Sequence, residues 1–580
     1  MSHSIYKNLI RIFLFAIILS CSTKSNFEMN SEKVKKIISA HSDSVSASKN
    51  FPDKDVRKYL YKEFQEFYKD REYALAWLDF DQPLASSEEL LIAIDKADKE
   101  GLEPENYNLT KIEKLLKKIY KVESKKEKRK HRRATKSLNK DKREQAREQD
   151  TLRLHDIVSL DFLMTSSYLT YASHLLSGKI NPDESELWFA KPRKEDLSAH
   201  LTEALNKKSI QKSLQDLAPK HPQYALLKKE LERLRAINEK DTFPKIRLEK
   251  RLKINDAHPS IVPIKYKFSL LGDLAQNDSS KVFDKRLENA VKRFQVRNGL
   301  EGTGVLDTRT IAILNWPLEE RIEQLIVNME RMRWFPDSFG DHYLLVNIPE
   351  YKMRLYKKGK KVVEMKVIVG TEYNPTPIFS DSMEYIVFNP TWTVPTSIAI
   401  REFIPKAKEN PDFFKENGYT IYQSWKKNAD TVNYDTINWM EVDTTKFNYR
   451  IVEKPGEKNS LGLVKFIFPN NLDIYLHDTP GNYLFNAKNR SFSHGCVRLE
   501  KPFDLAAYLL KDKGWDLKKV REHIKNNTEP EVVMLPEKIP VHIVYWTAWV
   551  DDDGVLNFAR DVYQHDRQQE KAIKKKEALF

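Results

Sequence analysis

The spacing of apolar residues divides the chain into a helical part and a later part rich in strands. Residues 51–252 repeat apolar positions at helical intervals and contain few glycines, which predicts an α-helical scaffold domain. From Tyr343 to Gly370 apolar and polar residues alternate around a turn at Lys358 and Gly359, as in a hairpin that enters a sheet. The pattern therefore predicts a multidomain α+β protein.

Two further segments have a helical pattern. Between Leu287 and Phe294 the apolar residues fall on one face of a helix, and after a glycine turn Asp307 or Thr308 caps the next helix. Residues 398–448, rich in Lys, Asn and aromatic residues, are helix-forming and interrupt the strand pattern of the later part. We interpret them as an insertion.

The N-terminus has the pattern of an export signal. Basic residues precede an apolar stretch from Ile12 to Leu19, which is too short to span a bilayer comfortably but suits a signal peptide. Cys21 follows in a context that resembles a bacterial lipobox. We expect a signal segment over 1–21, a lipid on Cys21 and a tether over 22–50, with an uncleaved anchor or ordinary cleavage as open alternatives.

One segment carries a surplus of positive charge equal to half of the chain's net charge. The formal net charge is +14, and residues 121–150 hold thirteen Lys or Arg against six Asp or Glu. Such a run binds nucleic acid or anionic lipid in some proteins, but it is more often a solvated loop or exposed helix. It contains no aromatic residue that would stack on single-stranded bases. We expect no nucleic-acid partner; anionic wall polymers or the membrane surface fit better.

The candidate chemistry lies around one of the two cysteines. Cys496 follows Ser493, His494 and Gly495, and His477 lies nineteen residues upstream. A thiolate attacks acyl carbons, and a nearby imidazole either takes the thiol proton or holds the thiolate as an ion pair. A glycine before the nucleophile permits a tight turn that directs backbone N–H groups at an oxyanion. The spacing indicates a cysteine nucleophile with its base.

Asp478 follows His477 directly, and its backbone carbonyl or its carboxylate can orient the second ring nitrogen. We expect the amides of Gly495 and Cys496 to form the oxyanion hole. Two other interpretations exist. A buried cysteine is often inert, and one cysteine with two histidines offers three zinc ligands, although the chain lacks any CxxC or HExxH element to complete such a site.

The segments HDTPGNYLF and SHGCVRLEKPFDLA resemble the active-site signature of the L,D-transpeptidases, which have a YkuD-type catalytic domain. The resemblance implies that Cys496 is the nucleophile, His477 the general base and His494 a second histidine of the site. Ser493 and Gly495 correspond to the turn that shapes the oxyanion hole. No metal or organic cofactor is implied.

The resemblance extends to the large Gram-negative, YcbB-like branch, in which the insertion is similar to a mobile cap over the substrate groove. Arg498 would hold a substrate carboxylate, with a structural ion pair as the alternative. The full set of expected substrate contacts is Ser493, Arg498, Tyr422, Trp425 and Trp439, although for any one of the three aromatic residues ordinary packing of the insertion is the alternative.

The expected fold is a mostly β catalytic domain with a helical cap, a small three-helix domain similar to the PG_binding_1 type, and the α-helical scaffold. The expected bounds are 51–252 for the scaffold with its basic insertion 121–150, 263–316 for the peptidoglycan-binding-like domain, 318–550 for the catalytic domain with its cap 398–448, and 551–580 for a C-terminal strand and basic tail.

The activity implied by the resemblance is a two-step acyl transfer between peptidoglycan stem peptides. Cys496 attacks a tetrapeptide donor and releases D-alanine, and the diaminopimelate amine of a neighbouring stem then forms a 3→3 cross-link. An L,D-carboxypeptidase or exchange enzyme, and a non-catalytic wall-binding lipoprotein, are the alternatives. The expected location is the periplasm, with a lipid anchor in the outer rather than the inner membrane.

Overall fold

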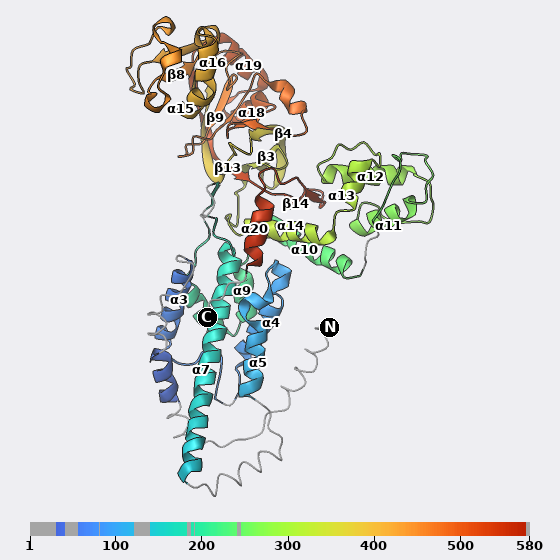
Figure 1. The fold of residues 1–580 in the computed structure, drawn as a ribbon, viewed down its shortest axis with the longest axis vertical. Coiled ribbons are helices and arrows are strands. Elements are labelled where there is room, and N and C mark those ends of the chain that lie inside the picture. The colour runs from blue at the N-terminus through green and yellow to red at the C-terminus, as the bar shows by residue number, and fades with distance from the viewer. Residues whose placement is uncertain are drawn as a thin grey trace. The chain divides into compact units, whose positions relative to one another are not determined.

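The structure is a computed structural model that describes residues 31–40, 56–80, 82–120, 140–182, 187–190, 192–240 and 245–575. Its contacts divide the chain into two compact units (Figure 1). The helical unit comprises Met1–Ser177, Lys194–Ala218 and Lys576–Phe580, and the mixed unit comprises Gly178–Arg193 and Pro219–Lys575.

The helical unit is built around one long helix, α7 (Lys140–Ser177), with α3 on one side and α4 and α5 on the other (Figure 1). Buried Asp161 of α7 accepts hydrogen bonds from Tyr68 Oη at 2.6 Å and from the Trp77 amide at 2.9 Å, which fixes the neighbouring segments to α7. The predicted helical character is thus confirmed. The other helices of this unit are α3 (Val56–Asp70), α4 (Ala85–Asp95), α5 (Leu109–Ile119), α8 (Leu197–Lys207) and α9 (Ile210–Leu217).

The bounds of the helical unit differ from the expected scaffold domain of 51–252. Segment Gly178–Arg193 and helix α10 (Pro222–Asn238) belong to the mixed unit. The helical pattern did not distinguish them because a helix repeats apolar positions whichever core it packs against. Of the basic segment, residues 140–150 extend α7, and 121–139 lie outside the described residues.

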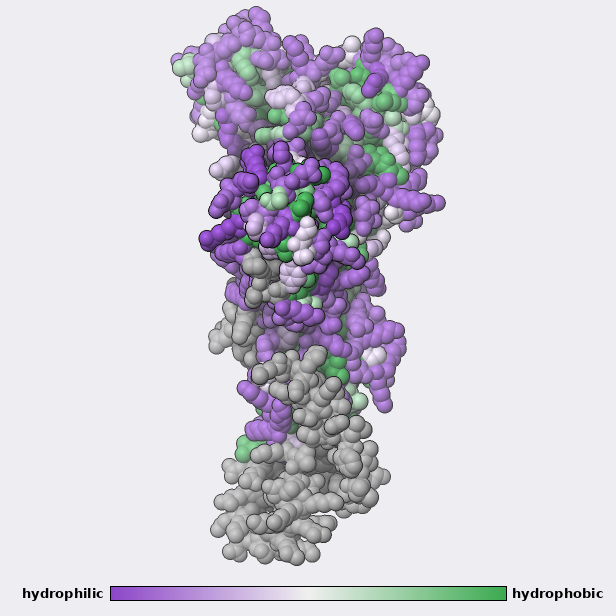
Figure 2. Space-filling model, turned by 90° about the vertical axis from the view of Figure 1, so that its right-hand side faces the viewer, coloured by the Kyte–Doolittle hydropathy of each residue, from purple (hydrophilic) through white to green (hydrophobic). Residues whose placement is uncertain are grey.

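The expected signal segment, the tether over 22–50 and Cys21 fall outside the described ranges, apart from residues 31–40, which form a helix. Among the helices that are described, none is both long and apolar enough to cross a membrane. Figure 2 shows a mainly hydrophilic surface on the face that it presents, with hydrophobic residues in small separate patches.

Three short helices of the mixed unit form the small domain expected around 263–316. They are α11 (Ile261–Leu271), α12 (Lys285–Arg297) and α13 (Thr308–Leu314). The apolar face predicted for α12 is fully buried, and the Asp307 side chain caps α13 by accepting a hydrogen bond from the Thr310 amide at 2.8 Å. Both expectations are confirmed.

The main sheet of the mixed unit closes on itself. Its strand order is β1-β5-β13-β2-β3-β4-β12-β10-β9, and β9 also pairs with β5. The predicted alternation from Tyr343 to Gly370 forms three successive antiparallel strands, with the turn at Lys358 and Gly359 as expected. The strands are β1 (Trp188–Phe189), β2 (His342–Asn347), β3 (Lys352–Lys357), β4 (Lys360–Gly370), β5 (Ile378–Phe388), β9 (Val464–Ile467), β10 (Leu476–His477), β12 (Val497–Leu499) and β13 (Glu531–Val544).

The C-terminal region differs from the expected strand and tail over 551–580. Strands β14 (Ala548–Val550) and β15 (Leu556–Phe558) form a hairpin, and helix α20 (His565–Lys574) follows. Arg331 of α14 (Leu318–Met332) is fully buried and forms an ion pair with Asp566 of α20 at 2.7 Å. Three basic residues of the expected tail, Arg567, Lys571 and Lys574, therefore lie on a docked helix.

The insertion is larger than the expected cap of 398–448 and contains a sheet. Strands β6 (Trp392–Thr393), β7 (Tyr419–Tyr422) and β8 (Arg450–Glu453) pair in the order β6-β8-β7. We refer to residues 392–453 as the insertion. Its helices are α15 (Thr396–Ile398), η5 (Ala399–Phe403), α16 (Ile404–Glu409) and α17 (Phe413–Glu416), and they share an apolar core with the strands. Strands of two to four residues are too short to show an alternating pattern.

Candidate active site

The pairing of two short strands brings the predicted catalytic residues together. Strands β10 and β12 run parallel, with Leu476 opposite Val497 and His477 opposite Arg498. The Val497 amide donates to the Tyr475 carbonyl at 3.1 Å, so Cys496, immediately before β12, lies beside the start of β10. Since alternate residues of a strand share a face, Cys496 and Arg498 project on the same side as Tyr475 and His477.

The orientation of His477 is set by the backbone of its neighbour. The ring is buried, and its Nδ1 lies 2.6 Å from the Asp478 carbonyl, an acceptor, so that Nδ1 carries the proton and Nε2 is left as the basic nitrogen. The Asp478 carboxylate instead accepts a hydrogen bond from the Leu463 amide at 2.9 Å. Of the two open possibilities for Asp478, the structure selects the carbonyl.

The turn that carries the cysteine is fixed by internal hydrogen bonds. The Ser493 hydroxyl donates to the Cys496 carbonyl at 2.6 Å and accepts from the Gly495 amide at 3.2 Å. Gly495 has φ +122°, a conformation that other residues rarely adopt, and its carbonyl accepts a hydrogen bond from Thr376 Oγ1 at 2.7 Å. Ser493 is buried, so it supports the turn and does not face a groove.

These bonds also bear on the expected oxyanion hole. In this structure the Gly495 amide is already paired with Ser493 Oγ, whereas the Cys496 amide has no partner within the described ranges. The Cys496 amide is thus the donor available to an oxyanion. Gly495 acts through the backbone conformation that it permits.

The resting cysteine and histidine are both neutral. Burial raises the pKa of the Cys496 thiol, partly offset by hydrogen bonds from Tyr475 and by the charges of Lys465 and Arg498. Burial and the neighbouring Arg498 lower the pKa of His477 to about 3. A neutral thiol and a neutral imidazole are therefore favoured over a preformed ion pair.

Sequence reasoning missed two neighbours of this pair, Lys465 and Tyr475. Lys465 of β9 lies directly opposite His477 in the antiparallel β9–β10 pairing, and its Nζ lies 3.7 Å from the centre of the Tyr475 ring. A single lysine between the apolar residues of VKFIF was the available signal, but it gave no indication of which strand lies beside it. Lys465 supplies a positive charge near the thiol.

Arg498 is available to bind a ligand. It forms no ion pair within the part of the chain that the structure describes, and its buried Nε has no hydrogen-bond partner. The alternative of a structural ion pair is therefore not observed. A guanidinium in this state can bind a carboxylate through two parallel hydrogen bonds.

His494 connects the catalytic turn to the insertion. Its Nε2 forms a short contact with Glu402 of η5, and the two side chains are 39% and 40% exposed. Glu402 was not predicted, because it is 92 residues from His494 and no sequence pattern relates them. This contact places the insertion against the catalytic turn.

The three aromatic candidates lie in different environments. Trp439 is only 3% exposed and packs on Phe414 in the core of the insertion, so it does not line a groove. Tyr422 is half-buried under the Arg450 guanidinium, which lies 4.1 Å from its ring centre. Trp425 is 47% exposed and is accessible to a ligand.

The zinc interpretation finds no geometric support. No group of three or more His, Cys, Asp or Glu side chains converges as metal ligands anywhere in the described ranges. Cys496 itself is a free thiol.

Three segments of the chain match models of known domain families. Residues 341–543 match the model of the L,D-transpeptidase catalytic domain, 258–314 a "Putative peptidoglycan binding domain", and 62–231 a Scaffold domain. The chain thus contains an L,D-transpeptidase catalytic domain and a peptidoglycan-binding domain, and the expected multidomain α+β class is confirmed.

A curated relative from Haemophilus influenzae, named "Putative L,D-transpeptidase", is 35% identical over 246 residues, which is 42% of this chain and 48% of the relative. The chain thus spans about half the length of that relative. A solved L,D-transpeptidase from Stackebrandtia nassauensis is 13% identical over 52% of this chain and 97% of its own, with a TM-score of 0.18. A mutant Enterococcus faecium L,D-transpeptidase is 12% identical over 55% of this chain and 100% of its own, with a TM-score of 0.16.

Proposed function

We propose that this protein is a peptidoglycan L,D-transpeptidase that forms 3→3 cross-links through a thioester on Cys496. The observation that carries the proposal is the pairing of β10 and β12, which puts Cys496 on the same face as His477, a histidine whose Nδ1 is held by the Asp478 carbonyl. The matched catalytic and peptidoglycan-binding domains support stem peptides as the substrate.

In the first step Cys496 Sγ attacks the carbonyl carbon of the third residue of a tetrapeptide stem. His477 Nε2 takes the thiol proton and then donates it to the leaving nitrogen, so that the amide bond breaks and D-alanine departs. The Cys496 amide stabilises the oxyanion, and Lys465 and Arg498 offset the negative charge that develops in the buried site.

In the second step the side-chain amine of diaminopimelate on a neighbouring stem attacks the thioester carbon. His477 accepts a proton from the amine and returns it to the departing sulfur, so that the new amide bond forms as the C–S bond breaks and Cys496 is regenerated as a thiol. The insertion, held against the catalytic turn by Glu402 and His494, limits the access of water to the thioester and favours transfer over hydrolysis.

Mass spectrometry of the products tests the proposal. The purified protein is incubated with disaccharide tetrapeptide, with Cys496→Ala as the control. We expect a cross-linked dimer one D-alanine lighter than two substrates, and an enzyme adduct at Cys496. If tripeptide is the sole product, the activity is that of a carboxypeptidase and not of a transpeptidase. If the substrate is unchanged although the protein is folded, a binding role is favoured.

We also propose a periplasmic location with a lipid on Cys21. The basis is the sequence pattern of residues 1–21, which resembles a lipobox-terminated signal. Incorporation of labelled palmitate in cells tests it, with Cys21→Ser as the control. Equal labelling of both proteins would contradict lipidation at this residue.

A further inference from the structure

The turn between β8 and β9 is closed by the hydrogen bonds of one buried residue. Asn459 is 2% exposed, and its Nδ2 donates to the Lys454 carbonyl at 2.7 Å. Its Oδ1 accepts a hydrogen bond from the Leu461 amide, and its carbonyl accepts one from the Gly462 amide, both at 2.8 Å. We refer to residues 454–463 as the connecting turn. These bonds fix the path along which the chain enters β9.

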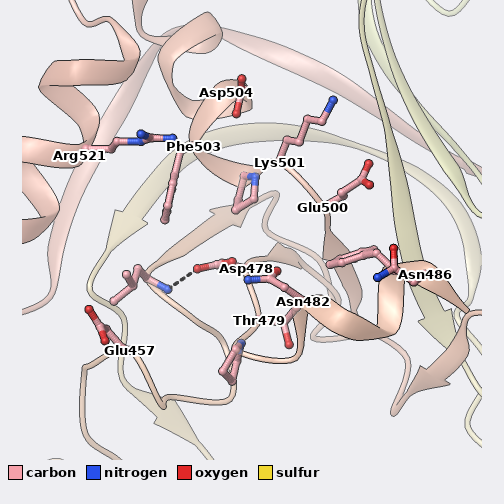
Figure 3. Close-up of a pocket in the computed structure, with 14 residues that line it drawn as sticks. Glu457, Asp478, Thr479, Asn482, Asn486, Glu500, Lys501, Phe503, Asp504 and Arg521 are labelled. Carbon is pink, nitrogen blue, oxygen red and sulfur yellow. Dashed lines mark hydrogen bonds between the residues drawn. The ribbon is translucent and has the colours of Figure 1, made fainter.

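The end of the connecting turn holds the side chain of Asp478. The Leu463 amide donates to Asp478 Oδ2 at 2.9 Å, a bond that Figure 3 draws as a dashed line. The Asp478 amide donates to the Val464 carbonyl at 2.9 Å, which continues the β9–β10 pairing by one residue. Gly462 has φ +61°, and a Cβ there would lie 2.4 Å from Asp478 Cγ and Oδ2. The turn therefore touches the carboxylate, and only glycine leaves room for it.

The carboxylate of Asp478 has backbone partners and no cation. The residue is 7% exposed and forms no ion pair within the described ranges. Burial raises the pKa of its carboxyl group, and hydrogen bonds from the Leu463 and Thr479 amides partly offset the rise. The Thr479 N–H and the Asp478 carbonyl belong to the same planar peptide group. The carboxylate thus holds the peptide whose carbonyl lies 2.6 Å from His477 Nδ1.

We propose that the Asp478 carboxylate positions His477: it fixes the Asp478–Thr479 peptide, and the carbonyl of that peptide fixes the tautomer of the ring. With the carbonyl in place, Nδ1 carries the proton and Nε2 accepts the proton of the Cys496 thiol. Without the carboxylate the peptide can rotate, and the Nε2–H tautomer, which cannot accept that proton, becomes populated. The tautomer is a property of the resting protein, and only its consequence for the reaction rests on the proposed function.

The tautomer of His477 is read by two-bond proton–nitrogen NMR of the full protein with isotope-labelled histidine, at neutral pH. The His477→Gln variant assigns the signals of this ring. We expect the Nδ1–H tautomer alone in the parent protein and both tautomers in Asp478→Ala. Asp478→Asn keeps one oxygen acceptor, so it should show less of the second tautomer than Asp478→Ala does. A single Nδ1–H tautomer in Asp478→Ala would overturn the proposal.

Two glycines of the connecting turn separate the contact with Asp478 from backbone strain. Gly462→Ala leaves Asp478 in the chain but puts a methyl group against its carboxylate, so it should also populate both tautomers. Gly456 has φ +145°, and beyond its chain neighbours no described atom lies within 4 Å of a Cβ there. Gly456→Ala is therefore the matched control, and it should keep the parent tautomer although its backbone is strained. Equal spectra of the two variants would remove the contact as the cause.

The kinetic consequence is measured on the cross-linking reaction. Asp478→Ala should lower kcat by about 10–100-fold, as a partial loss of base catalysis. KM should change less than about twofold, because the carboxylate acts on the base and not on the substrate.

Asn328→Ala controls for a general loss of packing. It removes another buried, hydrogen-bonded side chain of the mixed unit, so it should lower the melting temperature and leave kcat unchanged. An unchanged kcat in Asp478→Ala, or an equal loss in Asn328→Ala, would overturn the positioning role. Inactivity of the parent protein would instead count against the proposed function, and the NMR spectra alone would then decide the role of Asp478.

Discussion

The three catalytic strands and the insertion hold their functional groups in different ways. In β9, β10 and β12 the register of backbone pairing places Lys465, His477 and Cys496 on one face, and most of the surroundings are buried. The insertion has its own sheet and core, and it contacts the catalytic turn through the partly exposed pair of Glu402 and His494. Under the proposed function, the strands would set the chemistry and the insertion would adjust access to it.

The largest effect is expected from replacing His477, the proposed base, which the strand pairing holds in place. His477→Gln removes the basic nitrogen but keeps a side chain of similar size, so the rate of cross-linking should fall by about 10²–10⁴-fold. The measurement is the initial rate of dimer formation by mass spectrometry.

His494→Gln is the matched control for this change, because it alters the other histidine of the site. Its effect should be smaller by at least tenfold, since His494 contacts the insertion and its Nε2 is engaged by Glu402. Equal losses in the two variants would mean that His477 is not the sole base.

The independence of the insertion is tested through its core. Trp439→Ala removes a side chain that is 3% exposed, which should destabilise the insertion by about 3–5 kcal/mol. Hydrogen exchange should then rise across residues 392–453 and stay unchanged in β10 and β12. Trp425→Ala, at an exposed position of the same insertion, should change stability by less than about 0.5 kcal/mol. Unfolding of the whole mixed unit in Trp439→Ala would contradict independence.

The same contrast explains how much could be predicted from the sequence. Cys496 and His477 could be proposed as nucleophile and base because the motif around Cys496 is contiguous and its spacing to His477 is short. The strands from Tyr343 to Gly370 were found because they are long enough to alternate. The role of Asp478 stayed open, since a carbonyl and a carboxylate of one residue cannot be distinguished without the backbone path.

What could not be predicted depends on partners far apart in the chain. Lys465 acquires its role from antiparallel pairing with His477, and Glu402 from docking of the insertion on the catalytic turn. The short strands of the insertion have no alternating pattern, so its sequence predicts only helix. Local patterns identify elements, and tertiary pairing decides which residues meet.

A moderate effect is expected from the charge that the register places beside the thiol. The positive charge of Lys465 lowers the pKa of Cys496 against the rise caused by burial. In Lys465→Met that pKa should rise further, so the pH at half-maximal alkylation by iodoacetamide should move to a higher value. Lys458→Met, an exposed lysine in the preceding turn, should leave the profile unchanged. A profile shifted to lower pH would contradict the assignment.

The smallest effect is expected where the insertion meets the turn. Glu402→Gln removes the carboxylate that contacts His494. A contact between two side chains that are about 40% exposed contributes at most about 1 kcal/mol, so the melting temperature should hardly change. If the insertion limits water at the thioester, the ratio of tripeptide to cross-linked dimer should rise about two- to fivefold. Glu409→Gln, exposed on α16 of the same insertion, is the matched control. If the product ratio and the total rate were both unchanged, this contact would have no part in excluding water. The strands β9, β10 and β12 alone would then set the balance between transfer and hydrolysis.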